Sequence, residues 1–198
     1  MNEQEALWID KALKGDDQSF GHLVEAYQKP VFSLCYRMLG NANDAEDAAQ
    51  ETFIRAYQHL RRYDRNRSFA TWLLSIASHH CIDRMRKRQL ATVSADALPG
   101  EIIADSNAPN PERVFQGQEK EALLQRLLSQ LKPTDRAAII LRYWYDYSEA
   151  MIAEALDLSV SAVKSRLYRS RQLLAQLWAN AESANVISER KPNESPAF

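Results

Sequence analysis

The sequence has 198 residues, which is enough for one large or two small domains. Hydrophobic residues make up 45% of it and charged residues 26%, the composition of a soluble globular protein rather than of a disordered or membrane-spanning one. The formal net charge is −1, so overall charge gives no sign of a nucleic-acid partner and the distribution of charge along the chain has to be examined instead.

The N-terminal part of the chain is predicted to be helical. Its first residues are acidic and lack an apolar segment, so we expect no signal peptide, and no apolar run approaches membrane-spanning length. Hydrophobic residues recur at helical spacing over residues 20–38, and Gly40 is a typical helix stop. Asn43, with Glu46 three residues later, favours the start of a second helix. A third helix is expected after Ser68, which closes a helical domain over residues 6–90.

Acidic and basic residues separate within this domain. Four acids and no base occur between residues 41 and 51, whereas arginines follow at 55 and around the loop 61–67, and the third helix ends in the basic run DRMRKR. A basic face with Tyr63 at its edge suits a single-stranded nucleic acid, whose bases can stack on an aromatic ring. The acidic stretch indicates a second, protein partner, although acids also favour the first turn of any helix.

The middle of the chain has the composition of a linker. Residues 91–116 contain three prolines, one glycine, and four acids against one arginine, so we expect a flexible acidic connection. Helical periodicity returns in a second domain, expected over residues 117–180, in which Pro133 suits a first helical turn and Ser148 and Ser159 suit N-caps. We expect that domain's last helix to end near Trp178, and residues 181–198 to form a disordered tail.

The stretch DYSEAMIAEALDLSVSAVKSRLYRSRQLL has the form of a helix-turn-helix, with a short helix, a tight turn at Asp157 and Leu158, and a longer helix. The second helix buries one apolar face, and from residue 159 to 174 it carries four basic residues and no acid. Such a helix fits the major groove of DNA, although a solvated cationic surface helix has the same composition.

Catalytic and metal sites are not predicted. His79, His80, Cys81 and Asp83 are close in sequence, but only His79 and Asp83 share a helix face, and no other ligands are spaced to join them. The only cysteines, Cys35 and Cys81, are expected to be buried thiols in a reducing cytosol. The sequence contains no nucleophile–base pair, glycine-rich phosphate loop or carboxylate pair, so we expect neither an enzyme nor a cofactor.

Four blocks of sequence resemble the extracytoplasmic-function (ECF) sigma factors of bacterial RNA polymerase. They are NDAEDAAQETFIRAY, SFATWLLSIASHHCIDRMRKR, LKPTDRAAIILRYW and IAEALDLSVSAVKSRLYRSR, and the resemblance spans residues 6 to 178. It implies an all-α protein of two small helical domains joined by a flexible linker, the C-terminal one a helix-turn-helix. The N-terminal domain would bind polymerase core and melt the minus-ten promoter element, and the C-terminal domain would recognise the minus-thirty-five element.

The resemblance also assigns residues to partners. Contacts to the β′ clamp of polymerase core fall to Asp47, Gln50, Glu51 and Arg55. Contacts to single-stranded minus-ten DNA fall to Tyr63, His79, Asp83, Arg84, Arg86, Lys87 and Arg88. Contacts to double-stranded minus-thirty-five DNA fall to Lys164, Ser165, Arg166, Tyr168 and Arg169, and the helical wheel adds Ser161 and Arg171 on the outer side of the same helix. An anti-sigma factor is a further expected partner, and the expected location is the cytoplasm, on the nucleoid, without membrane insertion.

The chain departs from the family pattern at several positions. The family often has Asn where His79 stands, Glu where Met151 stands and Gly where Asp157 stands, and Ser161 and Ala162 replace a common Gly-Thr pair. The changes at His79, Ser161 and Ala162 affect which DNA bases are preferred. The change at Met151 affects a helix cap, and the change at Asp157 affects the turn of the helix-turn-helix.

Two other classes of protein remain as alternatives. A helix-turn-helix regulator with a sensing domain explains only the C-terminal half, and a helical enzyme would need a catalytic constellation.

Overall fold

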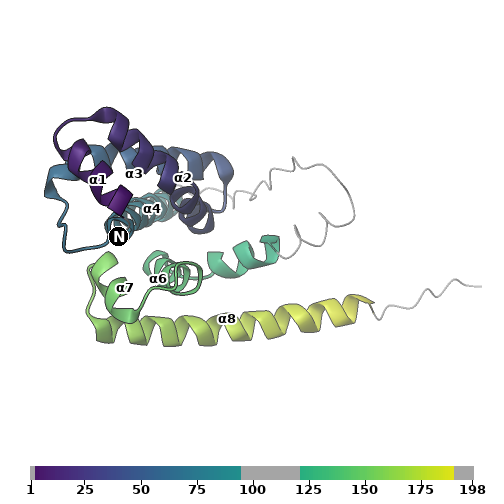
Figure 1. The fold of residues 1–198 in the computed structure, drawn as a ribbon. Helices are drawn as coiled ribbons and strands as arrows, with labels where there is room; N and C mark the ends of the chain where they lie inside the picture. The colour runs from purple at the N-terminus through teal and green to yellow at the C-terminus, as the bar shows by residue number, and fades with distance from the viewer. Residues whose placement is uncertain (1–2, 95–120, 190–198) are drawn as a thin grey trace, which may run out of the picture.

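The computed structural model describes residues 3–94 and 121–189, and every regular element in these ranges is a helix, which confirms the predicted all-α class. The helices form two groups, which we call the N-terminal unit (3–94) and the C-terminal unit (121–189) (Figure 1). The N-terminal unit contains α1 (Glu3–Leu13), α2 (Asp17–Leu39), α3 (Ala42–His59), the short 3-10 helix η1 (Leu60–Arg62) and α4 (Phe69–Ser94). The C-terminal unit contains a helix over 121–129, α6 (Pro133–Trp144), α7 (Glu149–Ala155) and α8 (Val160–Glu189).

Local sequence signals explain most helix ends. Gly40 ends α2 with φ of 74°, and its N–H donates to the carbonyl of Tyr36, as expected for a left-handed C-cap. The cap of α3 is Asn41, whose side chain accepts from the N–H of Asp44 at 3.0 Å. The prediction of Asn43 as that cap is wrong. Asn41 directly follows the left-handed residue and has extended backbone, so the helix begins two residues earlier.

The C-terminal unit contains the predicted helix-turn-helix, formed by α7 and α8. Ser148 accepts from the N–H of Met151 and Ser159 from the N–H of Ala162, both at 3.2 Å, so both predicted caps are confirmed. Asp157 occupies the turn with φ of 53°, a left-handed conformation that Asp tolerates better than most residues. Pro133 begins α6, as predicted.

Helix α8 is longer than predicted. It runs to Glu189 instead of ending near Trp178, because no Gly or Pro interrupts residues 160–189 and several good helix formers follow Trp178. At the other boundary, residues 91–94 continue α4. The rest of the predicted linker, residues 95–116, and the end of the predicted tail, residues 190–198, lie outside the described residues.

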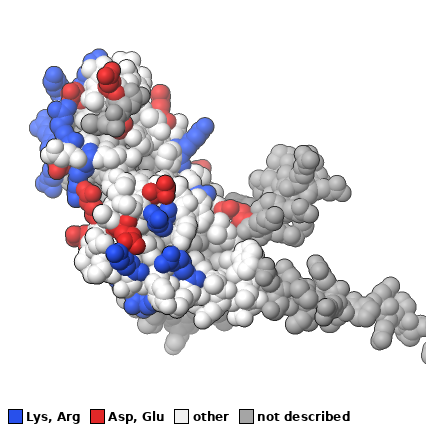
Figure 2. Space-filling view, turned by 60° about the horizontal axis from the view of Figure 1, so that its bottom comes forward, with Lys and Arg blue, Asp and Glu red and all other residues white. Residues whose placement is uncertain are grey.

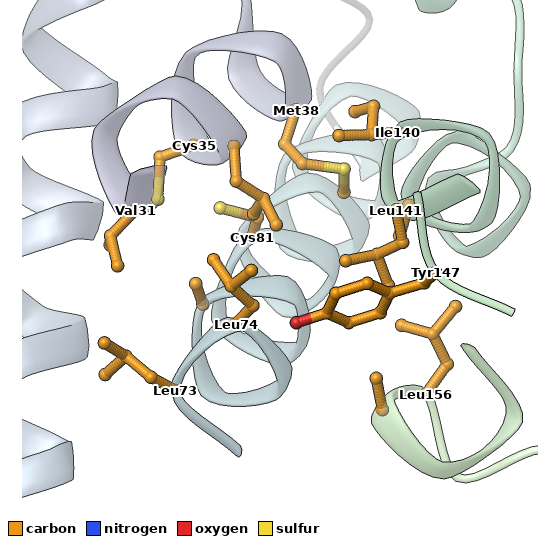
Figure 3. Close-up of a cluster of buried hydrophobic side chains, with 14 of the residues drawn as sticks. Val31, Cys35, Met38, Leu73, Leu74, Cys81, Ile140, Leu141, Tyr147 and Leu156 are labelled. Carbon is orange, nitrogen blue, oxygen red and sulfur yellow. The ribbon is translucent and has the colours of Figure 1, made fainter. Parts of the chain in front are cut away.

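The two units share one hydrophobic core. Helix α6 packs against α2 and α4, and α7 also packs against α4. Figure 3 shows side chains of both units meeting in this core, which brings Leu74 and Met38 close to Leu141, Tyr147 and Leu156. Helix α8 lies on the far side of α6 and α7 from the N-terminal unit (Figure 1).

Polar contacts also join the units. Arg136 of α6 is 4% exposed, and its Nε donates to the carbonyl oxygen of Arg37 at 2.8 Å. The hydroxyl of Tyr145 donates to the carbonyl oxygen of Pro30 at 2.6 Å. Arg67, in the loop before α4, forms an ion pair with Glu154 of α7. The described units are therefore closed on one another.

Within residues 3–94 and 121–189, no helix is long and apolar enough to cross a membrane. Cys35 and Cys81 are both free and buried, as predicted. A hydrogen bond with the Cys81 thiol, together with burial, raises the pKa of the Cys35 thiol far above its ordinary value, so it stays protonated and unreactive.

Candidate functional site

Helix α3 presents an acidic face to solvent. One side of the helix, including Ala45, Ala48 and Thr52, is buried against α2 and α4. The exposed side carries the residues predicted to contact polymerase core, which are Asp47, Gln50, Glu51 and Arg55. These four therefore lie together on one accessible side of one helix.

The electrostatics of this face are set within the helix and by α4. Arg55 Nε donates to Glu51 Oε1 at 2.6 Å, and this hydrogen bond lowers the pKa of the Glu51 carboxyl. The side chain of Asp47 is 68% exposed, and its nearest cation is Arg84, at 3.5 Å. The side chain of Glu51 is 38% exposed, so both carboxylates are accessible to a partner.

Two features of this surface escaped the sequence prediction. Ile54 is 51% exposed in the middle of the acidic face. Beside it, a groove of about 440 Å³ between α2 and α3 has a mixed lining. Its apolar side chains are Val24, Phe32, Ala49 and Phe53, and its polar ones are Gln28, Lys29, Glu46 and Gln50. The position of Ile54 on the α3 helical wheel, away from the buried alanines, is a signal that could have revealed it. The contribution of α2 depends on how the helices pack, which local sequence does not encode.

The basic end of α4 contacts the acidic start of α3. Arg84 and Arg88 both pair with the carboxylate of Asp44, Arg88 at 2.7 Å. Burial alone would raise the pKa of Asp44, but the two arginines outweigh it and hold the pKa below its usual value. The sequence separates an acidic from a basic region, and the fold brings them together through these ion pairs. Two of the four basic residues predicted to contact DNA here are thus partly committed within the protein.

The other residues predicted on α4 are more accessible. His79 and Asp83 lie on one exposed side, and the His79 ring Nδ1–H donates to the carbonyl oxygen of Ser75 at 2.9 Å. Lys87 and Arg86 are exposed, and the Arg86 guanidinium donates to Thr134 Oγ1 at 3.4 Å. His79 and Asp83 could therefore meet a nucleic-acid strand that runs along α4.

Tyr63 is buried, in contrast to the exposed residues predicted to contact DNA on α4. Its side chain is 6% exposed, with the ring packed edge-on against Phe69 at 5.4 Å and tilted against Trp72 at 5.2 Å. Its hydroxyl donates to the carbonyl oxygen of Arg67 at 2.5 Å. A base could stack on this ring only after the loop over residues 61–68 had moved.

The outer side of α8 carries small polar and basic side chains. The residues predicted to face upstream DNA are exposed, with one exception: Ser161, Lys164, Ser165, Tyr168, Arg169 and Arg171. Tyr168 is 57% exposed and accepts from Gln172 Nε2 at 2.8 Å. Arg169 makes no ion pair with any other described residue, so its guanidinium is open to a partner.

Two basic residues of α8, Arg166 and Arg171, make contacts within the protein, unlike Arg169. Arg166, the exception, is only 29% exposed at its side chain and pairs with Asp135 of α6 at 2.6 Å. It joins α8 to α6 inside the C-terminal unit. Arg171 Nε donates to the carbonyl oxygen of Leu167 at 3.2 Å, which folds the side chain along its own helix. The basic residues of this helix are thus unequal in their freedom to reach a base.

Charge on the visible surface gathers in two regions. Figure 2 shows one group of basic side chains along the N-terminal unit and a second over the C-terminal helices, with acidic side chains between them. Two separate basic regions fit two nucleic-acid contacts better than one continuous groove.

Comparison with protein families matches both units. The Sigma-70 region 2 family matches residues 23–91, and the Sigma-70, region 4 family matches residues 121–174. The ECF RNA polymerase sigma factor SigW of Bacillus subtilis is 37% identical over 174 residues, covering 84% of this chain and 92% of that protein. The ECF RNA polymerase sigma-E factor of Escherichia coli is 31% identical over 182 residues, covering 88% and 95%.

Solved structures share the fold. CnrH in complex with the cytosolic domain of CnrY gives a TM-score of 0.67 at 24% identity, covering 90% of this chain and 99% of that chain. The sigma factor RpoE of Bartonella quintana, in complex with the anti-sigma factor NepR, gives 0.65 at 22% identity and covers 82% and 98%. Two matched regions in order, and relatives similar over nearly their full length, establish that this chain belongs to the ECF RNA polymerase sigma factors, in which regions 2 and 4 serve promoter recognition and transcription initiation.

Proposed function

We propose that the chain binds RNA polymerase core through the exposed face of α3 and uses α4 and α8 for the minus-ten and minus-thirty-five elements of promoters. The observation that carries this proposal is the α3 face itself. Its charged residues Asp47 and Glu51 flank the exposed Ile54, while the opposite side of the helix is buried. An exposed apolar residue ringed by charges is typical of a protein interface.

The chemistry of this face suggests the kind of surface it meets. A complementary partner would offer basic side chains to Asp47 and Glu51 and an apolar side chain to Ile54 and the adjoining groove. A helical element such as the β′ clamp coiled coil can supply both, because residues three and four apart share a helix face. Gln50, which lines the groove, can then hydrogen-bond at its edge.

The DNA contacts divide between the two units. In the C-terminal unit, α8 follows the turn of a helix-turn-helix, and its N-terminal half exposes Ser161, Lys164, Ser165, Tyr168 and Arg169, the position from which a recognition helix contacts base edges. In the N-terminal unit, α4 and the preceding loop are proposed for single-stranded DNA. We place the region 2 domain at residues 6–90 and the region 4 domain at 117–180, joined by an acidic linker over 91–116.

The proposal extends to cellular setting and regulation. We place the protein in the cytoplasm, on the nucleoid, and assign it no chemistry of its own, because the polymerase carries out RNA synthesis. Two solved relatives of this fold were captured with the cytosolic domain of CnrY and with the anti-sigma factor NepR. A protein inhibitor of that kind is the expected regulator of this chain as well.

A double charge reversal tests the polymerase contact. Asp47→Lys with Glu51→Lys should weaken binding to polymerase core about tenfold or more, because two attractive contacts of roughly 0.5–1 kcal/mol each become repulsive. The control is Glu3→Lys with Glu25→Lys, which makes the same change of charge on exposed residues of α1 and α2. Affinity is measured by fluorescence titration, and circular dichroism checks the fold. Equal affinities for the two double variants would reject α3 as the contact.

A further inference from the structure

Two hydroxyl groups on the outer side of α8 differ in whether their proton is available to a partner. The hydroxyl of Ser165 donates to the carbonyl oxygen of Ser161 at 3.0 Å, so its single proton is used within the helix. The hydroxyl of Tyr168 instead accepts from Gln172 Nε2 at 2.8 Å. Within residues 3–94 and 121–189, no group accepts the Tyr168 proton. Tyr168 therefore keeps a hydrogen-bond donor for a partner outside the chain.

The amide of Gln172 orients this donor. Residues four apart are neighbours on a helix surface, which places the amide beside the phenol. A phenol has one proton, which lies near the ring plane on one of two sides of the oxygen, so an N–H on one side leaves the proton on the other. Tyr168 is 57% exposed, so packing alone leaves its ring free to change rotamer. The hydrogen bond from Gln172 thus orders a side chain that the core does not hold.

The surroundings of Tyr168 indicate which kind of acceptor it meets. Lys164 is four residues before Tyr168 and Arg171 is three residues after it, so the three side chains share one flank of α8. Glu149 offsets one of these charges, because its carboxylate lies 3.7 Å from Lys164 Nζ, but Arg171 pairs with no acid among the described residues. A donor on a cationic flank suits a phosphate oxygen, and tyrosine is one of the side chains that donate to phosphates. The outer side of α8 faces away from the N-terminal unit, so a duplex can reach it (Figure 1).

We propose that Gln172 is a positioning residue: its amide holds the Tyr168 hydroxyl so that the hydroxyl donates to a phosphate oxygen of the duplex that α8 binds. The inference rests on the proposed function, which assigns α8 to the minus-thirty-five element. Gln172 itself then needs no contact with DNA. Such a phosphate contact carries no sequence information, but it fixes the register of α8 in the groove and so supports the base contacts proposed for Arg169.

A double-mutant cycle tests whether Gln172 acts through Tyr168. Holoenzyme assembled from polymerase core and the full chain is titrated with a labelled promoter fragment. Tyr168→Phe removes only the hydroxyl and should weaken binding about tenfold, because a hydrogen bond to a charged phosphate is lost. Gln172→Met keeps the length of the side chain without the amide and should weaken binding about threefold, because the phenol is no longer ordered. In the Tyr168→Phe background, Gln172→Met should have no effect.

A charge variant reverses the direction of the hydrogen bond. In Gln172→Glu the carboxylate can only accept, so the Tyr168 proton turns toward it and away from DNA. The control is Gln176→Glu, which adds the same charge one turn further along the exposed side of α8. The ratio of the two losses should be several-fold larger in the otherwise wild-type chain than in the Tyr168→Phe background. Gln176→Met is the matched control for Gln172→Met and should bind like wild type.

Modified DNA identifies the acceptor. A methylphosphonate at a single position of the upstream element removes the charged oxygen of one phosphate, whereas a 7-deazapurine removes the N7 acceptor of one base. At one phosphate the methylphosphonate should weaken the wild type clearly and the Tyr168→Phe variant little, because the variant has already lost that contact. Each 7-deazapurine should weaken both proteins alike. The reverse pattern would mean that Tyr168 contacts a base edge and would overturn the phosphate assignment.

The outcomes separate the positioning role from the proposed function. If Gln172→Met weakens binding by the same factor with and without the Tyr168 hydroxyl, or if Tyr168→Phe binds like wild type, Gln172 does not act through Tyr168. An effect of Gln172→Met on helix stability alone would appear in both backgrounds and so would count against the proposal. The proposed function of α8 fails instead if wild-type holoenzyme binds a fragment with a scrambled upstream element as tightly as the native fragment.

Discussion

Individual residues of α8 differ in how freely they can reach DNA, and this difference sets their expected roles. Arg169 is exposed and pairs with no other described residue. Arg171 lies along its own helix, bonded to the carbonyl oxygen of Leu167, and Arg166 is held by Asp135. Sequence alone shows only a row of basic residues. Their contacts distinguish Arg169, a candidate base contact, and Arg171, a candidate phosphate contact, from Arg166, which joins α8 to α6.

Substitution of Arg169 and Arg171 should therefore have different effects. An arginine that contacts guanine O6 and N7 contributes about 1–3 kcal/mol of discrimination, so Arg169→Ala should relax specificity at one or two base pairs. Arg171→Ala should weaken binding to all sequences and lower the slope of the salt dependence by about one. Titration against a library of upstream elements at two salt concentrations distinguishes these effects. A uniform loss of affinity in both variants would mean that the helix contacts only the DNA backbone.

The turn of the helix-turn-helix stores a small strain at Asp157, whose φ is 53°. Glycine adopts this conformation without the steric cost of about 1 kcal/mol that a side chain incurs. Asp157→Gly should therefore raise the melting temperature by about 2–4 °C, and Asp157→Ala should lower it. Calorimetry of the two variants provides the measurement. Asp146, with φ of 51° outside this turn, is the matched site and should respond with the same signs.

At the scale of helices and loops, the sequence predicts the first and last residues of a helix well where a single capping or first-turn residue determines them. Gly40, Pro133, Ser148 and Ser159 lie where the sequence indicates. The choice between Asn41 and Asn43 depends on the backbone after Gly40, and two Asn residues so close together cannot be distinguished by type alone.

Local sequence does not predict contacts between side chains that are far apart in the chain. The helical wheel can place Arg136 on the buried side of α6, but its partner, the Arg37 carbonyl, is 99 residues earlier in the chain. The pairing of Asp44 with Arg84 and Arg88 likewise joins residues 40 and 44 positions apart. The sequence predicts which residues form the candidate site, and that assignment stays a prediction. The intramolecular partners of these residues, and how far their side chains are exposed, follow from tertiary packing.

Tyr63 illustrates this dependence and changes how its role should be tested. Because the ring is buried, Tyr63→Ala would remove core packing at a cost of roughly 3–5 kcal/mol and would confuse stability with DNA melting. Tyr63→Phe keeps the ring and loses only the hydrogen bond to Arg67. Tyr63→Leu keeps apolar volume without a ring.

If a base stacks on residue 63 once the loop has opened, the Phe variant should melt promoters normally. The Leu variant should form open complexes about tenfold more slowly, because base stacking contributes about 1–3 kcal/mol. Permanganate reactivity of unpaired thymines reports the rate. Normal melting by the Leu variant would exclude residue 63 as the stacking platform, and the Phe variant controls for loosening of the loop.

At the scale of the whole molecule, the proposal gives the chain one helix that binds polymerase and two regions that bind DNA. The α3 face is exposed on the N-terminal unit, and the outer side of α8 is exposed on the C-terminal unit. Contacts such as Tyr145 to Pro30 hold these units together.

Transcription reconstituted from purified components tests the central claim most directly. The protein is mixed with RNA polymerase core and a pool of genomic fragments, and the 5′ ends of the transcripts are sequenced. We expect transcripts from a limited set of start sites, each preceded by shared minus-ten and minus-thirty-five elements, and we expect the Asp47→Lys, Glu51→Lys variant to reduce them strongly. Start sites identical to those of polymerase core alone would contradict the account.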